Sequence, residues 1–238
     1  MRPLHEVLIE AASRKDVLPS TRRSALALAA AAPAAFGLNT VLAQVGAEKA
    51  GRKKKRKQRQ RRREEDARQN SRRNDIAILN YALTLEHLEY AFYRDALADD
   101  FGENDFDGFL DPNLYDRLLD IRDHEDTHVD ALIATIQQLG GDPVEELCYD
   151  FGYNNVNQFL GVAQALENTG VSAYDGAIAD IKSPSLQTTG ATIATVEARH
   201  ASYLNLINDD NPFPAAFDTP LDMDEVIDIA GQFIVECP

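Results

Sequence analysis

Two sets of side chains with the same spacing carry carboxylates and imidazoles that could bind metal ions. In each set a glutamate is followed seven residues later by a tyrosine, and a Glu-x-x-His follows further along the chain. The first set is Glu86, Tyr93, Glu125 and His128, and the second is Glu167, Tyr174, Glu197 and His200. Residues three or seven apart lie on one face of a helix. Each set can therefore direct its side chains toward one point.

Repetition of the whole pattern favours a metal centre over unrelated surface residues. A single Glu-x-x-His is more often an exposed glutamate near a hydrogen-bonded histidine. Here two of only five histidines have a glutamate three positions before them. Helical bundles hold two metal ions with a Glu on each of two helices and a Glu-x-x-His on each of the other two. Four carboxylates would neutralise two divalent ions, and these ligand types suit iron or manganese, with zinc as an alternative.

Apolar periodicity and turn residues predict an all-α chain. Asn74 or Asp75 would cap the first helix, and the chain between the second and third helices would cross the bundle. The expected helices lie at about 75–98, 112–139, 155–182, 185–208 and, as a shorter helix, 222–235, with the crossover at about 142–154.

These motifs resemble the ferritin-like superfamily, and within it the exported ferritin-like domain proteins related to plant desiccation-associated proteins. The resemblance covers about residues 74–238 and rests on Asn80–Tyr93, Asp123–His128, Gly140–Pro143, Cys148–Phe151, Val196–Tyr203 and Phe213–Phe217. It implies a ferritin-like four-helix bundle of two helical hairpins joined by a long crossover, plus a short C-terminal helix. It also implies that the metal ligands are Glu86, Glu125, His128, Glu167, Glu197 and His200. The superfamily includes iron stores, peroxidases, manganese catalases and oxygenases, so the resemblance leaves the activity open.

Five other residues lie close to these ligands in the sequence. Glu89 shares a helical face with the first lone glutamate, so it could be a seventh ligand, a hydrogen-bond acceptor behind the ligands, or the ligand in its place. Tyr93 and Tyr174 would line the interior, either hydrogen-bonded to ligand carboxylates or as core aromatics. His87 and His124 are each adjacent to a ligand in sequence, which turns them about a hundred degrees away. We expect both on outer faces.

The charge of the chain is divided sharply near residue 74. Residues 1–73 hold 19 Lys and Arg against 7 Asp and Glu, a net charge of +12. Residues 74–238 hold 5 Lys and Arg against 32 Asp and Glu, a net charge of −27. Phosphate contacts require cations, so we expect no nucleic-acid binding by this acidic domain. It has no apolar run of 18 or more residues, so we expect no transmembrane segment there.

Both cysteines of the chain, Cys148 and Cys237, lie in the acidic domain. In an exported protein they would form one disulfide that ties the C-terminal tail to the loop after the second helix. Two buried free thiols are the alternative if the protein stays in the cytosol.

Residues 1–43 are typical of a twin-arginine signal region. Arg22 and Arg23 precede an apolar run at residues 25–38, and Val41-Leu42-Ala43 would direct cleavage before Gln44. The alternative is an N-terminal extension that is not a signal. The pattern predicts export by the twin-arginine route to an extracytoplasmic or cell-surface location.

Residues 44–73 contain the basic block Gly51–Arg63. Because like charges repel, we expect a disordered polybasic linker here. We interpret it mainly as a spacer, with the anionic envelope as a candidate contact.

Two hypotheses for function follow from this sequence. The first is an exported ferritin-like protein whose two iron or manganese ions react with O2 or peroxide, as in a peroxidase, catalase or ferroxidase. The second is a non-catalytic stress or envelope scaffold protein with a structural metal or none. Either form could assemble as a homo-oligomer.

Overall fold

The computed structural model describes the backbone of residues 38–97 and 111–237, and side chains from residue 51 onward within these ranges. The elements in chain order are α2 (Leu38–Ala96), α3 (Pro112–Gln138), β1 (Cys148–Tyr149), α4 (Val156–Ile178), α5 (Pro184–Ile207), α6 (Met223–Ala230), the 3-10 turn η1 (Gly231–Phe233) and β2 (Ile234–Val235). Apart from two strands of two residues each, the described elements are helical. The predicted all-α class is therefore confirmed.

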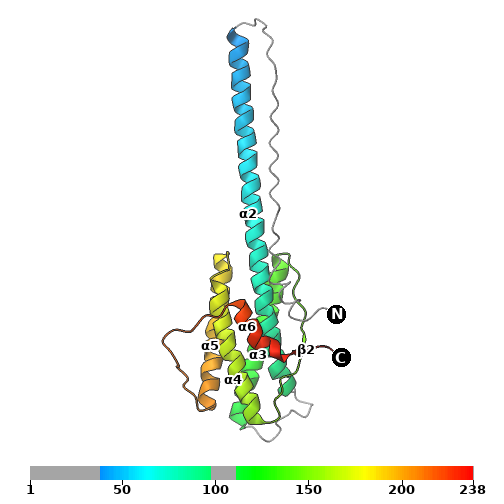
Figure 1. Ribbon diagram of the computed structural model, residues 1–238, viewed down its shortest axis with the longest axis vertical. Coiled ribbons are helices and arrows are strands. Elements are labelled where there is room, and N and C mark those ends of the chain that lie inside the picture. The colour runs from blue at the N-terminus through cyan, green and yellow to red at the C-terminus, as the bar shows by residue number, and fades with distance from the viewer. Residues whose placement is uncertain (1–37, 98–110, 238) are drawn as a thin grey trace. The chain divides into compact units, whose positions relative to one another are not determined.

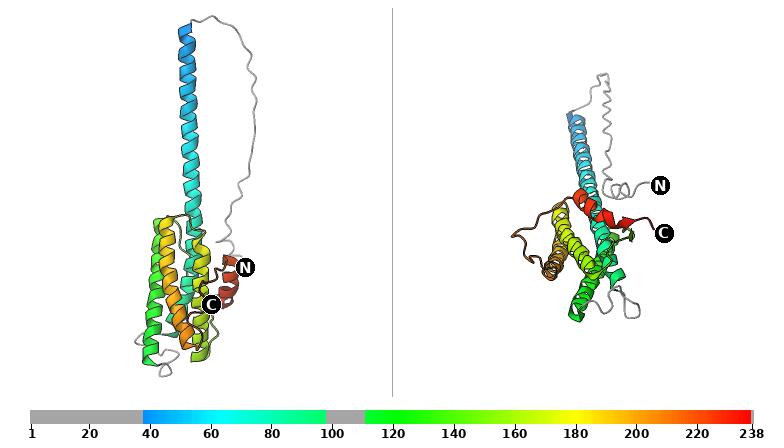
Figure 2. Two further views of the ribbon diagram at one scale, coloured as in Figure 1. Left: turned by 90° about the vertical axis from the view of Figure 1, so that its left-hand side faces the viewer. Right: turned by 60° about the horizontal axis from the view of Figure 1, so that its bottom comes forward.

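A four-helix bundle is formed by the C-terminal part of α2 together with α3, α4 and α5, which run side by side (Figures 1 and 2). The segment between α3 and α4 carries β1 and makes the expected long crossover between the two hairpins. Apolar side chains fill the bundle in two clusters, one around the stacked rings of Phe92 and Phe159 and one around Leu83 and Ile136. These clusters exclude water from the interior.

Polar side chains fix where several helices begin. The carboxylate of Asp111 accepts hydrogen bonds from the backbone N–H groups of Asn113 and Leu114, at 2.9 and 3.4 Å, and Pro112 occupies the first helical position of α3. The side chain of Asn155 caps α4 in the same way. The predicted starts of both helices agree with the structure.

Asp75 does not cap a helix that begins beside it, as the sequence suggested, because α2 runs through it without a break. Its buried carboxylate instead accepts hydrogen bonds from the backbone N–H groups of Lys182 and Ser183, at 2.6 and 3.1 Å. These groups immediately precede α5, so Asp75 orders the turn between α4 and α5 from a helix that is distant in sequence.

The basic block also differs from the prediction of a disordered linker. Residues 51–73 form part of α2, and every residue from 51 to 70 is exposed. Lys, Arg, Gln and Glu have high helix propensity, and the block contains no proline. Extending an existing helix also avoids the cost of nucleating a new one. The chain divides into two units at Asn70 and Ser71. Residues 1–37 of the predicted signal region lie outside the described residues.

The C-terminal tail is fastened to the crossover. Cys148 and Cys237, which are 89 residues apart, form a disulfide with their Cα atoms 5.2 Å apart. Beside it, β1 pairs antiparallel with β2, with Cys148 opposite Val235 and Tyr149 opposite Ile234. The last predicted helix is therefore shorter than expected. In the described part of the chain, no helix has both the length and the apolar character needed to cross a membrane.

Candidate metal centre

Each of the four bundle helices contributes ligand-type side chains to one buried polar layer. α2 provides Glu86, α3 provides the first Glu-x-x-His, α4 provides Glu167 and α5 provides the second Glu-x-x-His. All four glutamates have 0% exposure, and the two histidines are also buried. On α3 the ligand pair lies between Ile121, in one apolar cluster, and Leu132, in the other. The layer is therefore sealed by apolar packing along the bundle axis.

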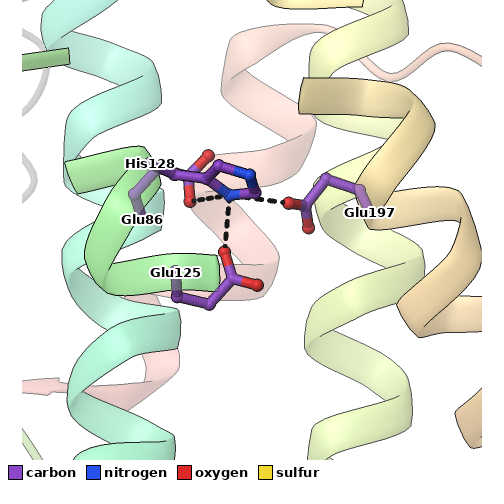
Figure 3. Close-up of side chains that lie close together, drawn as sticks. All are labelled: Glu86, Glu125, His128 and Glu197. Atoms are coloured by element: carbon purple, nitrogen blue, oxygen red, sulfur yellow. Dashed lines mark hydrogen bonds and ion pairs between the residues drawn. The ribbon is translucent and has the colours of Figure 1, made fainter. Parts of the chain in front are cut away.

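The histidines direct the same ring nitrogen, Nδ1, into the carboxylates. Nδ1 of His128 lies 2.9 Å from Glu125, 3.2 Å from Glu86 and 3.2 Å from Glu197 (Figure 3). Nδ1 of His200 lies 3.0 Å from Glu125 and 3.1 Å from Glu167. The six predicted residues are thus brought together at one place.

Two overlapping sets of four side chains have ligand atoms within 4.8 Å of one another. The two sets share Glu125 and Glu197. Glu86 and His128 complete one set, and Glu167 and His200 complete the other. Each set contains three carboxylates and one imidazole, so each offers a donor combination that divalent iron, manganese or zinc accepts.

Three carboxylate oxygens in the layer accept no well-aligned hydrogen bond from the described residues, although two of them lie 3.0 and 3.2 Å from a histidine Nδ1. They are Oε1 of Glu125 and both oxygens of Glu197, and all three are buried. A buried carboxylate oxygen without a donor is costly unless a cation lies nearby. The two glutamates with unpaired oxygens are the two that both sets share. These residues therefore fit a metal ion on physical grounds.

The tyrosines of the pattern connect the two halves of the layer. The hydroxyl of Tyr93 donates a hydrogen bond of 2.8 Å to Glu167, and the hydroxyl of Tyr174 donates one to Glu86. Each tyrosine therefore holds the lone glutamate of the opposite half. Burial and the adjacent carboxylates raise the pKa of both hydroxyls well above the ordinary value, so both remain protonated donors.

A family model for the ferritin-like domain matches residues 74–209, which is more than half of the chain. The chain belongs to the ferritin-like family. A solved structure of a conserved hypothetical protein from Mycobacterium tuberculosis is similar, with 20% identity and a TM-score of 0.48, covering 60% of this chain and 96% of the other. No curated protein matches the sequence.

Burial and charge shift the titration of this ferritin-like site. Burial raises the pKa of Glu125 to about 7, although bonds to both histidines lower it, and burial together with Glu125 raises the pKa of Glu197 well above its usual range. Burial alone would lower the pKa of both histidines. The effect of the neighbouring carboxylates is larger, and it raises the pKa of His128 to about 12 and that of His200 to about 10. Protonated imidazoles therefore offset the carboxylates, and a metal ion bound at Nδ1 would displace those protons.

Glu89 is also buried and lies beside the layer, although it belongs to neither set. A Cβ atom added at Gly170 would lie 2.9 Å from Oε1 of Glu89 and 3.2 Å from Oε2 of Glu197. Glu89 therefore occupies space that is open because residue 170 has no side chain. Of the two candidates on α2, Glu86 is the one placed among the other ligand-type residues.

The expectation that His87 and His124 lie on outer faces is wrong for His87 and is confirmed for His124. His87 is buried and its Nε2 lies 3.3 Å from the carbonyl oxygen of Val144, away from the ligand layer. His124 is exposed, but its Nδ1 lies 2.9 Å from Nε2 of His200 and the two rings are stacked. An imidazole on an outer face of one helix can still reach a residue on the next helix, as His124 does. A usable signal was present, since His124 precedes His128 by four residues and shares its face.

Proposed function

We propose that this ferritin-like protein binds two iron or manganese ions in a carboxylate-bridged centre for redox chemistry with O2 or peroxide, or for metal oxidation. The observation that carries the proposal is that the two ligand sets share Glu125 and Glu197. A carboxylate has two oxygens and can bind a different ion with each. On these same two residues, three buried oxygens accept no well-aligned hydrogen bond, and a cation would satisfy them.

In this proposal the unshared residues determine where each ion binds. Glu86 and His128 would hold one ion, and Glu167 and His200 would hold the other. Four carboxylates carry a charge of about −4, which two divalent ions offset without protonated histidines. Oxygen-rich ligation with one imidazole for each ion suits iron and manganese, and zinc would compete for the same donors.

The surrounding residues have defined tasks in this chemistry. Bound iron or manganese supplies the electrons that O2 or peroxide accepts. Tyr93 and Tyr174 keep the two lone glutamates oriented by donating to one carboxylate oxygen each, which leaves the other oxygen for an ion. The apolar clusters at both ends of the layer limit the access of water. A low local dielectric strengthens the attraction between carboxylates and cations.

A non-catalytic scaffold is the second candidate function, and one observation favours it. The histidines already balance part of the carboxylate charge through five ion-pair contacts in the layer. A layer balanced by its own protons could maintain the fold without metal. In that case the acidic surface and its partners, rather than the layer, would carry the function.

The metal content of the full chain separates the two candidates. The chain would be purified without added metal, reconstituted anaerobically with Fe(II) or Mn(II), and compared with Glu197→Ala/His200→Ala. We expect about two ions for each chain, and a loss of bound metal in the variant. The exposed Glu145→Ala is the matched control and should retain both ions.

Peroxide consumption by the loaded chain then tests the redox part. Turnover that disappears in the double variant and persists in Glu145→Ala would support catalysis. If the wild-type chain binds no metal, or binds it without consuming O2 or peroxide, the redox proposal is overturned and the scaffold stands.

We also propose export by the twin-arginine route, on the strength of Arg22, Arg23 and the apolar run after them. Replacement of both arginines by lysine keeps the charge but removes the paired guanidinium groups. The variant should accumulate inside the cell while the parent chain is exported. Equal fractionation of the two chains would contradict the proposal.

A further inference from the structure

Besides the two tyrosines, a histidine outside the two ligand sets is hydrogen-bonded directly to a ligand-type residue. His124 projects from α3 toward α5, where its Nδ1 lies 2.9 Å from Nε2 of His200. The rings are nearly parallel, with an angle of 10° between their planes and 5.2 Å between their centroids. Since Nδ1 of His200 faces Glu125 and Glu167, both nitrogens of His200 are engaged.

The second half of the bundle lacks this arrangement. The residue before Glu125 is His124, and the residue at the same position before Glu197 is Val196. A valine side chain has no hydrogen-bonding atom. Among the described residues, Nε2 of His128 has no hydrogen-bond partner, whereas its Nδ1 contacts three carboxylates. One imidazole of the layer is therefore fixed at its outer nitrogen, and the other is not.

We propose that His124 is a positioning residue that makes the two metal positions unequal. By accepting a hydrogen bond from Nε2–H of His200, it keeps a proton on Nε2 and the ring oriented, so that Nδ1 is the nitrogen that a metal ion would bind. The position that contains Glu167 and His200 then binds its ion more tightly than the position that contains Glu86 and His128. The inference rests on the proposed two-metal function and adds an order of filling to it.

General properties of metal-bound histidines set the size of the effect. A neutral imidazole has one N–H, and the hydrogen bond made by one nitrogen determines which nitrogen is free to bind metal. Groups that accept this outer hydrogen bond orient the ring and raise its basicity, and their removal weakens metal binding by about 10- to 100-fold. His124 is exposed, so its replacement does not open a cavity in the core.

The test is an anaerobic titration of the full-length chain with Co(II), followed by its visible absorption. Wild type, His124→Leu, His124→Asn and Val196→Ala would be compared. His124→Leu removes the acceptor. His124→Asn keeps an oxygen near the position of Nδ1. Val196→Ala changes the corresponding position in the other half. Thermal melting before metal addition would show whether each variant folds as wild type does.

We expect two binding phases in wild type and a 10- to 100-fold weakening of the tighter phase in His124→Leu. His124→Asn should restore most of the affinity, and Val196→Ala should leave both phases unchanged. If wild type binds two ions and His124→Leu binds them identically, the role of His124 is refuted while the two-metal proposal survives. If wild type binds no Co(II), Fe(II) or Mn(II), both are refuted. Weakening of both phases equally would also contradict the assignment of His124 to one position.

Discussion

The two halves of the bundle place the same ligand types in the same order but surround them differently. The first half pairs α2 with α3 and the second pairs α4 with α5. Next to the ligands, Glu89 in the first half corresponds to Gly170 in the second, and His124 corresponds to Val196. The four differing residues lie one turn or one residue from a glutamate of the layer. The ligand positions thus follow a twofold repeat, whereas the neighbours give each half a separate environment.

The difference shows how a repeated motif can support an unequal site. Glu89 occupies space that only a glycine at position 170 leaves free. If both halves had a glutamate there, a second buried carboxylate would have to share that space with Glu89. Asymmetry beside the layer is therefore compatible with symmetry inside it, because the missing side chain in one half accommodates the extra one in the other.

Shared and unshared ligands give the largest expected contrast. Glu125→Ala should abolish binding of both ions, because the residue belongs to both sets. Glu86→Ala should weaken the binding of one ion by at least about 10-fold and leave the other ion bound. Metal content after reconstitution distinguishes the two outcomes. Equal losses in the two variants would show that the division into shared and unshared ligands is wrong.

Tyr93 and Tyr174, which each donate to the lone glutamate of the opposite half, should contribute equally to the free energy of unfolding. Tyr93→Phe and Tyr174→Phe each remove a hydrogen bond to a buried carboxylate, which costs about 1.5–3 kcal/mol of unfolding free energy. Urea unfolding of the full chain without metal would measure both. The half-buried Tyr203→Phe is the control and should change stability little. A difference of more than about 1 kcal/mol between the two variants would break the equivalence.

Gly170→Ala tests whether the space beside Glu89 is required. The added methyl group would press on Glu89 and Glu197, so we expect a loss of about 1–3 kcal/mol of stability. Combination with Glu89→Ala should recover much of that loss, which a double-mutant cycle would detect. Gly161 lies in the same helix with open space around it, so Gly161→Ala should stabilise by about 0.5–1 kcal/mol. Destabilisation at both glycines alike would point to a general helix effect.

The pH dependence of stability should be the most gradual of these effects. The pKa of Glu125 is raised to about 7, and those of His200 and His128 to about 10 and about 12. The folded chain therefore holds protons that the unfolded chain has released, so without metal its stability should fall as pH rises from about 4.5 through 7 and on toward 10. Each extra proton contributes at most about 1.4 kcal/mol per pH unit. Urea midpoints should show this slope, and His200→Gln should reduce it above pH 7. A slope of opposite sign would contradict the protonated histidines.

Local spacing was enough to predict that four helices form the bundle and which residues gather in the polar layer, but not where α2 begins or where α6 ends. Glu86, Glu125 and His128 can be recognised because a helical face repeats within a few residues along the sequence. The predicted helix ends near Pro112 and Asn155 agree with the structure for the same reason, since capping is a local interaction.

Contacts between distant segments were beyond reach of such patterns. The bonds of Asp75 to the turn before α5 and of His124 to His200 join residues more than 70 positions apart. The two-residue strands are too short to show alternation, and their pairing depends on how the tail folds back. In the basic block, helix propensity outweighs the repulsion between like charges, and the structure has a helix there.

The disulfide between Cys148 and Cys237 encloses α4, α5 and α6 in a closed covalent loop. Within that loop, the segment between α5 and α6 exposes Phe213 and Phe217 at 79% and 89%. A protease that cuts there would open the loop without releasing a fragment, because the two pieces would remain joined through sulfur. The nicked chain would migrate as one species on a gel without reductant and as two species with it. After a cut in this loop, the two pieces therefore stay together only in surroundings that keep the disulfide oxidised.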